Sequence, residues 1–311
     1  DHHNDTLISA NRLQTNILSF KKVAASNLQF GTLKADALNF HLKTYKGEKH
    51  SNLDVFVKAF DNGKPGSGKF RLKAAKLTVE NGHFRLTNGN AISPRVLDFK
   101  KLNGELNNFY IKASDVYADI LRLSLLDHRG LFVENLAAKF SYTKTNIILD
   151  NLKLVTKESA LQGAVKLTYT REDFKDFVNK VKFDFTVDKA SVASNELNLF
   201  YNEFGKNQKF YLSTRFKGPL NNFVLHDLRL LDAAQNEISG TVNFRHLFDR
   251  QGPGFYMNGN FDRIASDYTH LVAIMPRILG KSVPKLVEKF GRMDIVGKVE
   301  LTKKDIATEI Y

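Results

Sequence analysis

The sequence contains no cysteine and no tryptophan, and it has no long apolar run. The absence of cysteine excludes disulfide bonds, thiolate zinc sites and cysteine nucleophiles. It leaves the cellular compartment open, because both reducing and oxidising surroundings hold proteins without disulfides. The longest apolar run, residues 271–275, is far shorter than the roughly 20 residues of a membrane-spanning helix. The sequence therefore predicts no such helix.

No signal peptide is visible either, and the chain begins at Asp1 without a methionine. We interpret it as a segment of a longer protein whose membrane anchor lies outside these residues. A compact globule of 311 residues could bury about 75% of its unfolded surface, so the fold needs neither disulfides nor a metal. The net charge of +13 indicates an anionic environment or partner. Because the 46 basic residues are spread through the chain, a solvated outer face is the default interpretation.

Short catalytic and nucleotide-binding motifs are absent or incomplete. Residues 63–69, GKPGSGK, resemble the phosphate-binding pattern G-x-x-x-x-G-K-[ST], but Phe70 replaces the hydroxyl residue that would hold magnesium. A strand is predicted at residues 70–74, where that motif requires a helix, so we interpret 63–68 as a hairpin loop. Neither G-x-S-x-G nor H-E-x-x-H occurs in the sequence.

Two groups of histidine and charged residues are weaker candidates. His2 and His3 could ligate a metal, but the sequence shows no third ligand nearby and adjacent side chains point apart on a strand. We therefore expect a frayed terminus and no metal site. Asp127, His128 and Arg129 stand in a predicted turn without a nucleophile. No zinc knuckle, aromatic binding strand or basic helix favours nucleic acid. The sequence predicts no catalytic residues, no cofactor and no nucleic-acid partner, so we expect a protein that is not an enzyme.

Alternation of apolar and polar residues is the dominant pattern, and residues 131–169 show it best. Strands with one apolar face are predicted at 136–142, 147–155 and 161–169, with turns at 143–146 and 156–159. Asn-Gly dipeptides at 81–82 and 88–89 predict two more turns. Further strands are predicted at 13–20, 23–30, 33–45, 53–59, 70–74, 77–80, 84–87, 96–99, 102–106, 109–112, 120–126, 181–187, 210–216, 238–244, 255–261 and 295–301.

Glycine recurs in the apolar phase of four predicted strands, at Gly163, Gly240, Gly259 and Gly297. Because glycine weakens a strand, its recurrence on the apolar face predicts a bend or a close approach of another backbone. Chance placement among the 19 glycines of the chain is the alternative.

Predicted helices are few and short. They cover residues 170–178 after a capped start, 194–204 before Gly205, and 284–290 before Gly291. The strongest is predicted at 266–279, with a kink at Pro276 and an end at Gly280. Its apolar stripe consists of Tyr268, Leu271, Val272, Met275 and Leu279.

These patterns predict a mostly β fold: an elongated, largely antiparallel β-sheet curled into an open hydrophobic trough, with a few short helices at its edge or mouth. A closed sandwich or barrel that seals the same apolar faces is the alternative. We expect one continuous β-groove segment over residues 1–311, divisible into 1–130 and 131–311. The expected lining consists of Leu136, Phe140, Tyr142, Leu161, Val165, Leu167, Val181, Phe183, Phe185, Val187, Phe210, Leu212, Phe216, Ile238, Val242, Phe244, Ile295, Val299 and Leu301.

Two expectations about placement follow. Lys139, Lys166, Lys182 and Arg245 should face solvent outside the trough, because the apolar residues occupy the other phase of each strand. The strands before and after the helix at 266–279, at 255–261 and 295–301, should be neighbours in the same sheet, and the helix should pack across the apolar face near one end. It would be either a fixed cap or a movable lid.

Three stretches, residues 5–20, 123–169 and 261–291, carry a resemblance that extends over nearly the whole chain. The matching features are Asp5-Thr6, the turn at 129–131, the helix after Asp262, and a series formed by Leu154, Thr156, Ser159, Leu161 and Gly163. In these features the sequence resembles the TamB (translocation and assembly module) branch of the AsmA-like proteins, in the form found in Bacteroidota.

The resemblance implies a β-groove in the periplasm of a Gram-negative bacterium, hung from the inner membrane, whose apolar lining carries phospholipid toward the outer membrane. It also implies an N-terminal membrane helix and a C-terminal domain that contacts an outer-membrane barrel of the Omp85 type, both outside these residues. The alternative function is an assembly or translocation factor for outer-membrane proteins that binds client strands at its sheet edge.

Overall fold

The structure, a computed structural model, describes residues 1–17, 27–58, 71–91, 95–247, 254–302 and 305–311. The chain forms two compact units: unit 1 is Asp1–Lys157 with Tyr169–Asp176, and unit 2 is Glu158–Thr168 with Phe177–Tyr311. The described residues contain seventeen strands, mostly antiparallel, and only short helices, and their sheet is not closed into a barrel. The predicted mostly β, largely antiparallel and open fold is confirmed. The predicted loop at 63–68 lies outside the described residues.

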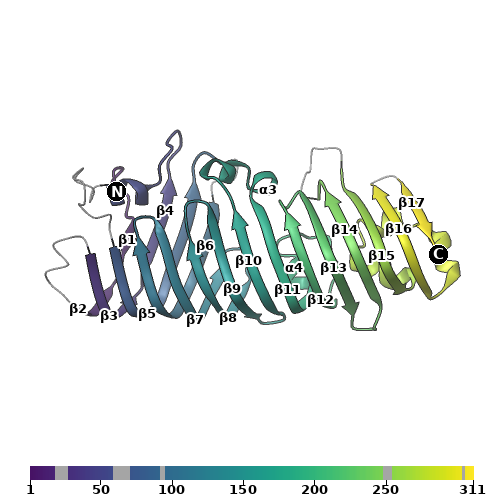
Figure 1. Cartoon of the computed structure of the whole chain (residues 1–311), viewed down its shortest axis with the longest axis horizontal. Coiled ribbons are helices and arrows are strands. Elements are labelled where there is room, and N and C mark those ends of the chain that lie inside the picture. Colours follow the sequence, from purple (N-terminus) through teal and green to yellow (C-terminus); the bar gives the residue numbers. More distant parts are fainter. Residues whose placement is uncertain (18–26, 59–70, 92–94, 248–253, 303–304) are drawn as a thin grey trace. The chain divides into compact units, whose positions relative to one another are not determined.

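Unit 1 is built around one long strand, β5 (Arg71–Asn88). Along one edge β5 pairs in parallel first with β3 (Asn27–Asp36) and then with β4 (Asn39–Thr44), and along the other edge it pairs with β6 (Arg95–Lys112). The remaining strands and helices are β1 (Ile8–Ser9), β2 (Arg12–Ile17), α2 (Asn52–Lys58), β7 (Asp115–Asp127), β8 (Phe132–Tyr142), β9 (Asn146–Thr156) and η1 (Arg171–Asp176) (Figure 1). From β5 to β9 the strands form an antiparallel meander.

The predicted turn at Asn81-Gly82 is wrong, because β5 continues through it. A two-residue turn of this type needs positive φ at both central residues, whereas Asn81 has φ 54° and Gly82 is not in that region. The extra residue is taken up as a β-bulge, and the Asn81 N–H donates to Asn103 Oδ1 at 2.9 Å. Bulges of the same kind make β6 one strand where three were predicted. The other Asn-Gly pair does turn, with the Ala91 N–H donating to the Asn88 carbonyl at 3.1 Å.

Unit 2 is an antiparallel meander in which each strand pairs with the next along the chain (Figure 1). Its strands are β10 (Ala160–Thr168), β11 (Lys182–Ala193), β12 (Lys209–Gly218), β13 (Asn222–Asp232), β14 (Glu237–Arg245), β15 (Tyr256–Ser266), β16 (Met293–Thr302) and β17 (Ile306–Ile310). Every pair from β10–β11 to β15–β16 contains a register shift. Bulges bend a strand and increase its twist.

Glycines occupy the places where these bulges bring two backbones together. A Cβ on Gly163 would overlap the Thr186 carbonyl oxygen, and one on Gly240 would overlap that of Asn260. Gly240 and Gly297 also have positive φ angles, 143° and 141°, which residues with a Cβ atom rarely adopt. The predicted close approach at these glycines is confirmed, and chance placement does not explain it. At Gly259 the neighbour is the Phe261 ring instead.

The helices are shorter than predicted. The helix predicted at 266–279 comprises only α5 (Tyr268–Ile274) and, after a break, α6 (Leu279–Ser282). Met275 leaves the α region, with φ −138° and ψ 76°, because the proline that follows disfavours that region. Pro276 therefore ends the helix instead of kinking it. Gly280 lies inside α6. Of the helix predicted at 194–204 only α4 (Ser194–Leu197) forms, whereas α3 (Phe177–Lys180) and η2 (Lys285–Phe290) agree with expectation.

Candidate functional site

The strand register brings most of the predicted lining residues of unit 2 onto one face, called here the apolar face. Across β10 and β11, Val165 lies opposite Phe185 and Leu167 opposite Phe183. Phe185 in turn lies opposite Phe216 of β12. On the far side, Val242 and Phe244 of β14 pair with Gly259 and Met257, which pair with Val299 and Leu301. Since side chains alternate along a strand, these residues share a face.

Strand β13 adds a part of this face that the sequence did not predict. Phe223 and Leu225 lie opposite Phe244 and Val242, but the next apolar residue on the face is Leu228, three positions further on. The interruption is a bulge at Asp227, which has φ 50°. Because the bulge shifts the phase by one residue, simple alternation breaks there and hides the strand. The signal that could have found it is two short alternating runs, 223–225 and 228–230, joined by a phase shift.

Phenylalanines from successive strands form a continuous row along one margin of this face. Phe216 and Phe223 stack with ring centroids 4.3 Å apart, and Phe223 and Phe244 stack at 5.1 Å. Phe183 meets Phe216 edge to face at 6.0 Å. The row continues to Phe177 at one end and Phe255 at the other. Aromatic pairs in these geometries contribute about 0.5–1.5 kcal/mol beyond burial, so the row fixes the side chains that edge the face.

Helix α5 covers another part of the apolar face. Leu271 packs against a buried cluster of Leu228, Val242, Phe261 and Ile264 from β13, β14 and β15, which confirms the prediction that the helix between β15 and β16 in the chain packs on the apolar face. The segment before β12 also holds the end of α5. The Gly205 N–H donates to the Ile274 carbonyl at 3.0 Å, and the Arg277 side chain donates to the Asn202 carbonyl at 2.7 Å. These bonds favour the fixed cap over the movable lid, a choice that stays a prediction.

The predicted lining of unit 2 divides into a buried and a half-buried group. Val242, in the cluster that Leu271 covers, is only 2% exposed, and Leu301 is only 1% exposed. Val187 and Phe210 are also buried, and Val181, which precedes β11, is fully buried. The remaining unit 2 lining residues, all half-buried, are Leu161, Val165, Leu167, Phe183, Phe185, Leu212, Phe216, Ile238, Phe244, Ile295 and Val299. Seven of these eleven residues lie on β10, β11 and β12, so the accessible part of the face lies mainly over those strands.

In unit 1 the predicted residues Leu136, Phe140 and Tyr142 are half-buried along β8. Phe140 pairs with Ala118 of β7 and Leu149 of β9, so unit 1 has an apolar face of the same construction. Whether it continues the apolar face of unit 2 stays a prediction.

The opposite face of the strands is charged and cross-linked by ion pairs. Lys139, Lys166, Lys182 and Arg245 are all exposed and occupy the polar phase, as predicted. On unit 2, Arg263 joins Asp294 at 2.7 Å and Glu237 at 3.3 Å. The hydrogen bond from Arg263 lowers the pKa of Asp294. Exposed pairs of this kind contribute at most about 1 kcal/mol each, so the polar face is a solvated surface and the apolar face is the candidate for ligand binding.

The turn at Asp127, predicted to be solvated, is instead partly buried. The Asp127 side chain is only 5% exposed and accepts hydrogen bonds from the Arg129 backbone N–H at 2.9 Å and from Arg129 Nε at 2.8 Å. Burial raises the pKa of Asp127, but the hydrogen bonds from Arg129 outweigh it, and the pKa is lower than its ordinary value. This carboxylate holds the turn between β7 and β8.

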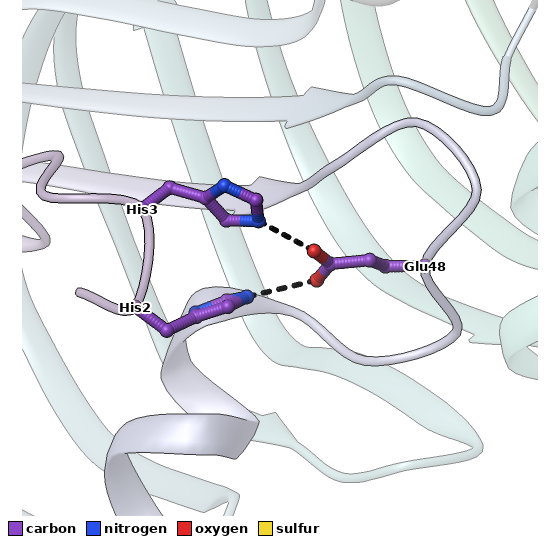
Figure 2. A group of neighbouring side chains, drawn as sticks. All are labelled: His2, His3 and Glu48. Carbon is purple, nitrogen blue, oxygen red and sulfur yellow. Dashed lines mark hydrogen bonds and ion pairs between the residues drawn. The ribbon is translucent and has the colours of Figure 1, made fainter.

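The expectation of a frayed terminus at His2 and His3 is wrong. Neither residue is in a strand, and both rings lie against Glu48, which is 45 or more positions away in the sequence (Figure 2). His2 Nε2 is 2.9 Å from Glu48 Oε2, and His3 Nε2 is 2.6 Å from Glu48 Oε1. Hydrogen bonds with His3 and His2 lower the pKa of Glu48. A third potential ligand is therefore present, and among the described residues this is the one group of its kind.

Comparison with protein families, with curated proteins and with solved structures finds no match for this chain. Within the described residues, no helix combines the length and the apolarity that crossing a membrane requires.

Proposed function

We propose that the apolar face of unit 2 binds lipid acyl chains, and that the chain is a segment of a protein that transfers phospholipid along a β-groove between the inner and outer membranes. The observation that carries the proposal is the row of half-buried apolar side chains across β10, β11 and β12 on an open sheet. Large exposed apolar surfaces on soluble proteins mark sites of interaction. The resemblance to the TamB branch supports the lipid interpretation.

The dimensions of the accessible face suit an acyl chain. One leaflet of a bilayer has an acyl layer of about 15 Å, half of the hydrocarbon core. Neighbouring strands are about 4.8 Å apart, so an acyl chain that crosses the strands would extend over about three strand spacings. That is the distance from β10 to β13, where Val165, Phe185, Phe216 and Leu225 lie opposite one another in turn. Each methylene removed from water contributes about 0.8 kcal/mol, with no polar partner required.

The charged polar face has a secondary role. Its unneutralised lysines and arginines, part of the net charge of +13, attract anionic headgroups or membrane surfaces weakly and in a salt-dependent way. This attraction would bring the protein to a membrane without selecting an acyl chain.

The test uses a charge placed on the accessible face. Phe185→Asp puts a carboxylate among the acyl chains, whereas Thr186→Asp puts the same group on the polar face at the next position of β11. Phospholipid that copurifies with each variant is quantified by mass spectrometry, and circular dichroism checks the fold. We expect Phe185→Asp to lose most of the lipid and Thr186→Asp to keep it. Val242 is not a suitable probe, because a carboxylate at a site 2% exposed would unfold the region.

A folded Phe185→Asp variant with unchanged lipid content would refute the proposal. Binding of unfolded outer-membrane protein strands by a lipid-free protein would favour the assembly-factor alternative instead.

A further inference from the structure

The first five residues fold into a compact turn that the Asp1 side chain organises. Asp1 Oδ1 accepts the backbone N–H groups of His3 and Asp5, each at 3.0 Å. Asn4 takes a positive φ of 61° and its N–H donates to the Asp1 carbonyl at 3.1 Å. This turn places the His2 and His3 rings side by side, with centroids 4.5 Å apart.

The turn is fastened to the end of β4. Lys43 Nζ lies 2.6 Å from Asp5 Oδ2, and the Tyr45 hydroxyl donates to carboxylate oxygens of Asp1 and Asp5 at 2.8 Å. The Tyr45 ring lies under His3 with centroids 3.8 Å apart and meets His2 edge to face at 5.4 Å. Both imidazoles therefore pack against the same aromatic ring.

Glu48 is positioned independently of the histidines. Its N–H donates to the Tyr45 carbonyl at 3.1 Å, which closes the tight turn after β4. Asn90, in the turn after β5, holds both sides of this turn: its Oδ1 accepts the Gly47 N–H at 2.7 Å and its Nδ2 donates to the Glu48 carbonyl at 2.8 Å. The carboxylate thus reaches the two rings from a loop that a backbone hydrogen bond and the Asn90 side chain hold (Figure 2).

We propose that His2, His3 and Glu48 form a binding site for a divalent transition-metal ion, with Zn²⁺ the best fit. Two imidazole nitrogens and one carboxylate are a ligand set that zinc uses with a fourth position left to solvent. The side chains are 30%, 45% and 30% exposed, so the fourth position faces water. Calcium and magnesium ions prefer oxygen ligands, so a site with two imidazole nitrogens binds them poorly.

The ligand atoms must move by about 1 Å to hold the ion. The ligand atoms all lie within 4.8 Å of one another, whereas ligand atoms of a tetrahedral zinc site with bonds of about 2.0–2.2 Å lie about 3.4 Å apart. The nitrogen to oxygen distances, 2.9 and 2.6 Å, must lengthen by about 0.5–0.8 Å when the metal replaces the shared protons. Ligand atoms that lie up to 4.8 Å apart must approach by up to about 1.4 Å. The ion would then join the terminal turn to the loop after β4, and stabilise this end of unit 1.

The test measures Zn²⁺ binding by isothermal titration calorimetry on the wild-type chain and three variants. Loss of an outer-shell partner of a ligand already costs about 10–100-fold in affinity, so Glu48→Gln and His3→Ala should each weaken binding by at least about tenfold. His128→Ala removes an exposed histidine elsewhere in unit 1 and should leave the affinity unchanged. X-ray absorption of the bound zinc should show two imidazole ligands.

Three results would overturn the proposal. One is no saturable binding at a one-to-one ratio. Another is an equal loss in His128→Ala, which would indicate an adventitious ion only. The third is sensitivity to His3→Ala without sensitivity to Glu48→Gln, which would indicate a chelate of the terminal amine and His3. Because Glu48→Gln preserves the size of the side chain and keeps one acceptor oxygen, circular dichroism should confirm that this variant is folded.

Discussion

Replacing Gly240 by alanine should destabilise unit 2, because this glycine sits at a bulge on the apolar face. Its φ is 143°, and a side chain held at such an angle costs about 1–3 kcal/mol. The new methyl group would also overlap the Asn260 carbonyl oxygen of β15. Moving β15 away weakens ladder hydrogen bonds that contribute about 1 kcal/mol each. The expected loss of unfolding free energy is therefore about 2–4 kcal/mol.

Gly280→Ala is the matched control. Gly280 lies in α6, and a Cβ added there meets nothing within 4 Å. Alanine is favoured over glycine in a helix by up to about 1 kcal/mol, so this variant should be neutral or slightly stabilised. Stability is measured by guanidinium unfolding followed by circular dichroism, and hydrogen exchange with mass spectrometry should locate the loss of protection in β14 and β15. A Gly240→Ala variant within about 0.5 kcal/mol of Gly280→Ala would refute the bulge argument.

Two further changes test the cap and the turn after β7. Leu271→Ala should lower the unfolding free energy by about 1–3 kcal/mol, less than the roughly 2–5 kcal/mol of a fully buried leucine, because this side chain is only half-buried. Thr269→Ala, on the exposed side of α5, should change the unfolding free energy little. Equal effects of the two variants would contradict the packing of α5. Asp127→Asn should cost about 1–3 kcal/mol at neutral pH. Because the folded pKa of Asp127 is lowered, its contribution to the unfolding free energy is present above the unfolded pKa of about 3.9 and is lost as the pH falls through the folded pKa. The difference in unfolding free energy between variant and wild type should therefore disappear in acid. A difference that is constant with pH would contradict the pairing with Arg129.

The sequence predicted strands such as β8, β10 and β14, where alternation runs without interruption. The strand predicted at 53–59 was wrong, because Ser51 and Asp54 cap a helix there, α2. The prediction also failed where a bulge shifts the phase: Asn81 was interpreted as a turn, and β13 was missed at Asp227. Whether an Asn-Gly pair turns or bulges depends on the partner strand, here on Asn103, which accepts the Asn81 N–H. Such long-range pairing is not visible in local sequence.

The two candidate sites differ in how far local sequence predicts them. The apolar face could be predicted because each strand carries its own periodic signal, so residues such as Phe185 and Val165 were placed without knowledge of the register. The cluster of His2, His3 and Glu48 could not, because it depends on a terminal turn that Tyr45 and Asp5 fasten to β4. At Pro276 the sequence correctly predicted that proline interrupts the helix. Whether the helix kinks or ends depended on the backbone of Met275, which leaves the α region and ends α5.

The most direct test of the account is photocrosslinking with a phospholipid that carries a diazirine in its acyl chain. The protein is loaded with this lipid and irradiated, and the modified peptides are identified by mass spectrometry. Binding to the apolar face predicts crosslinks in β10 to β12, at half-buried residues such as Val165, Phe185 and Leu212. Crosslinks confined to polar-phase residues such as Lys166 and Lys182, or no crosslinks above those of a Phe185→Asp variant, would contradict it.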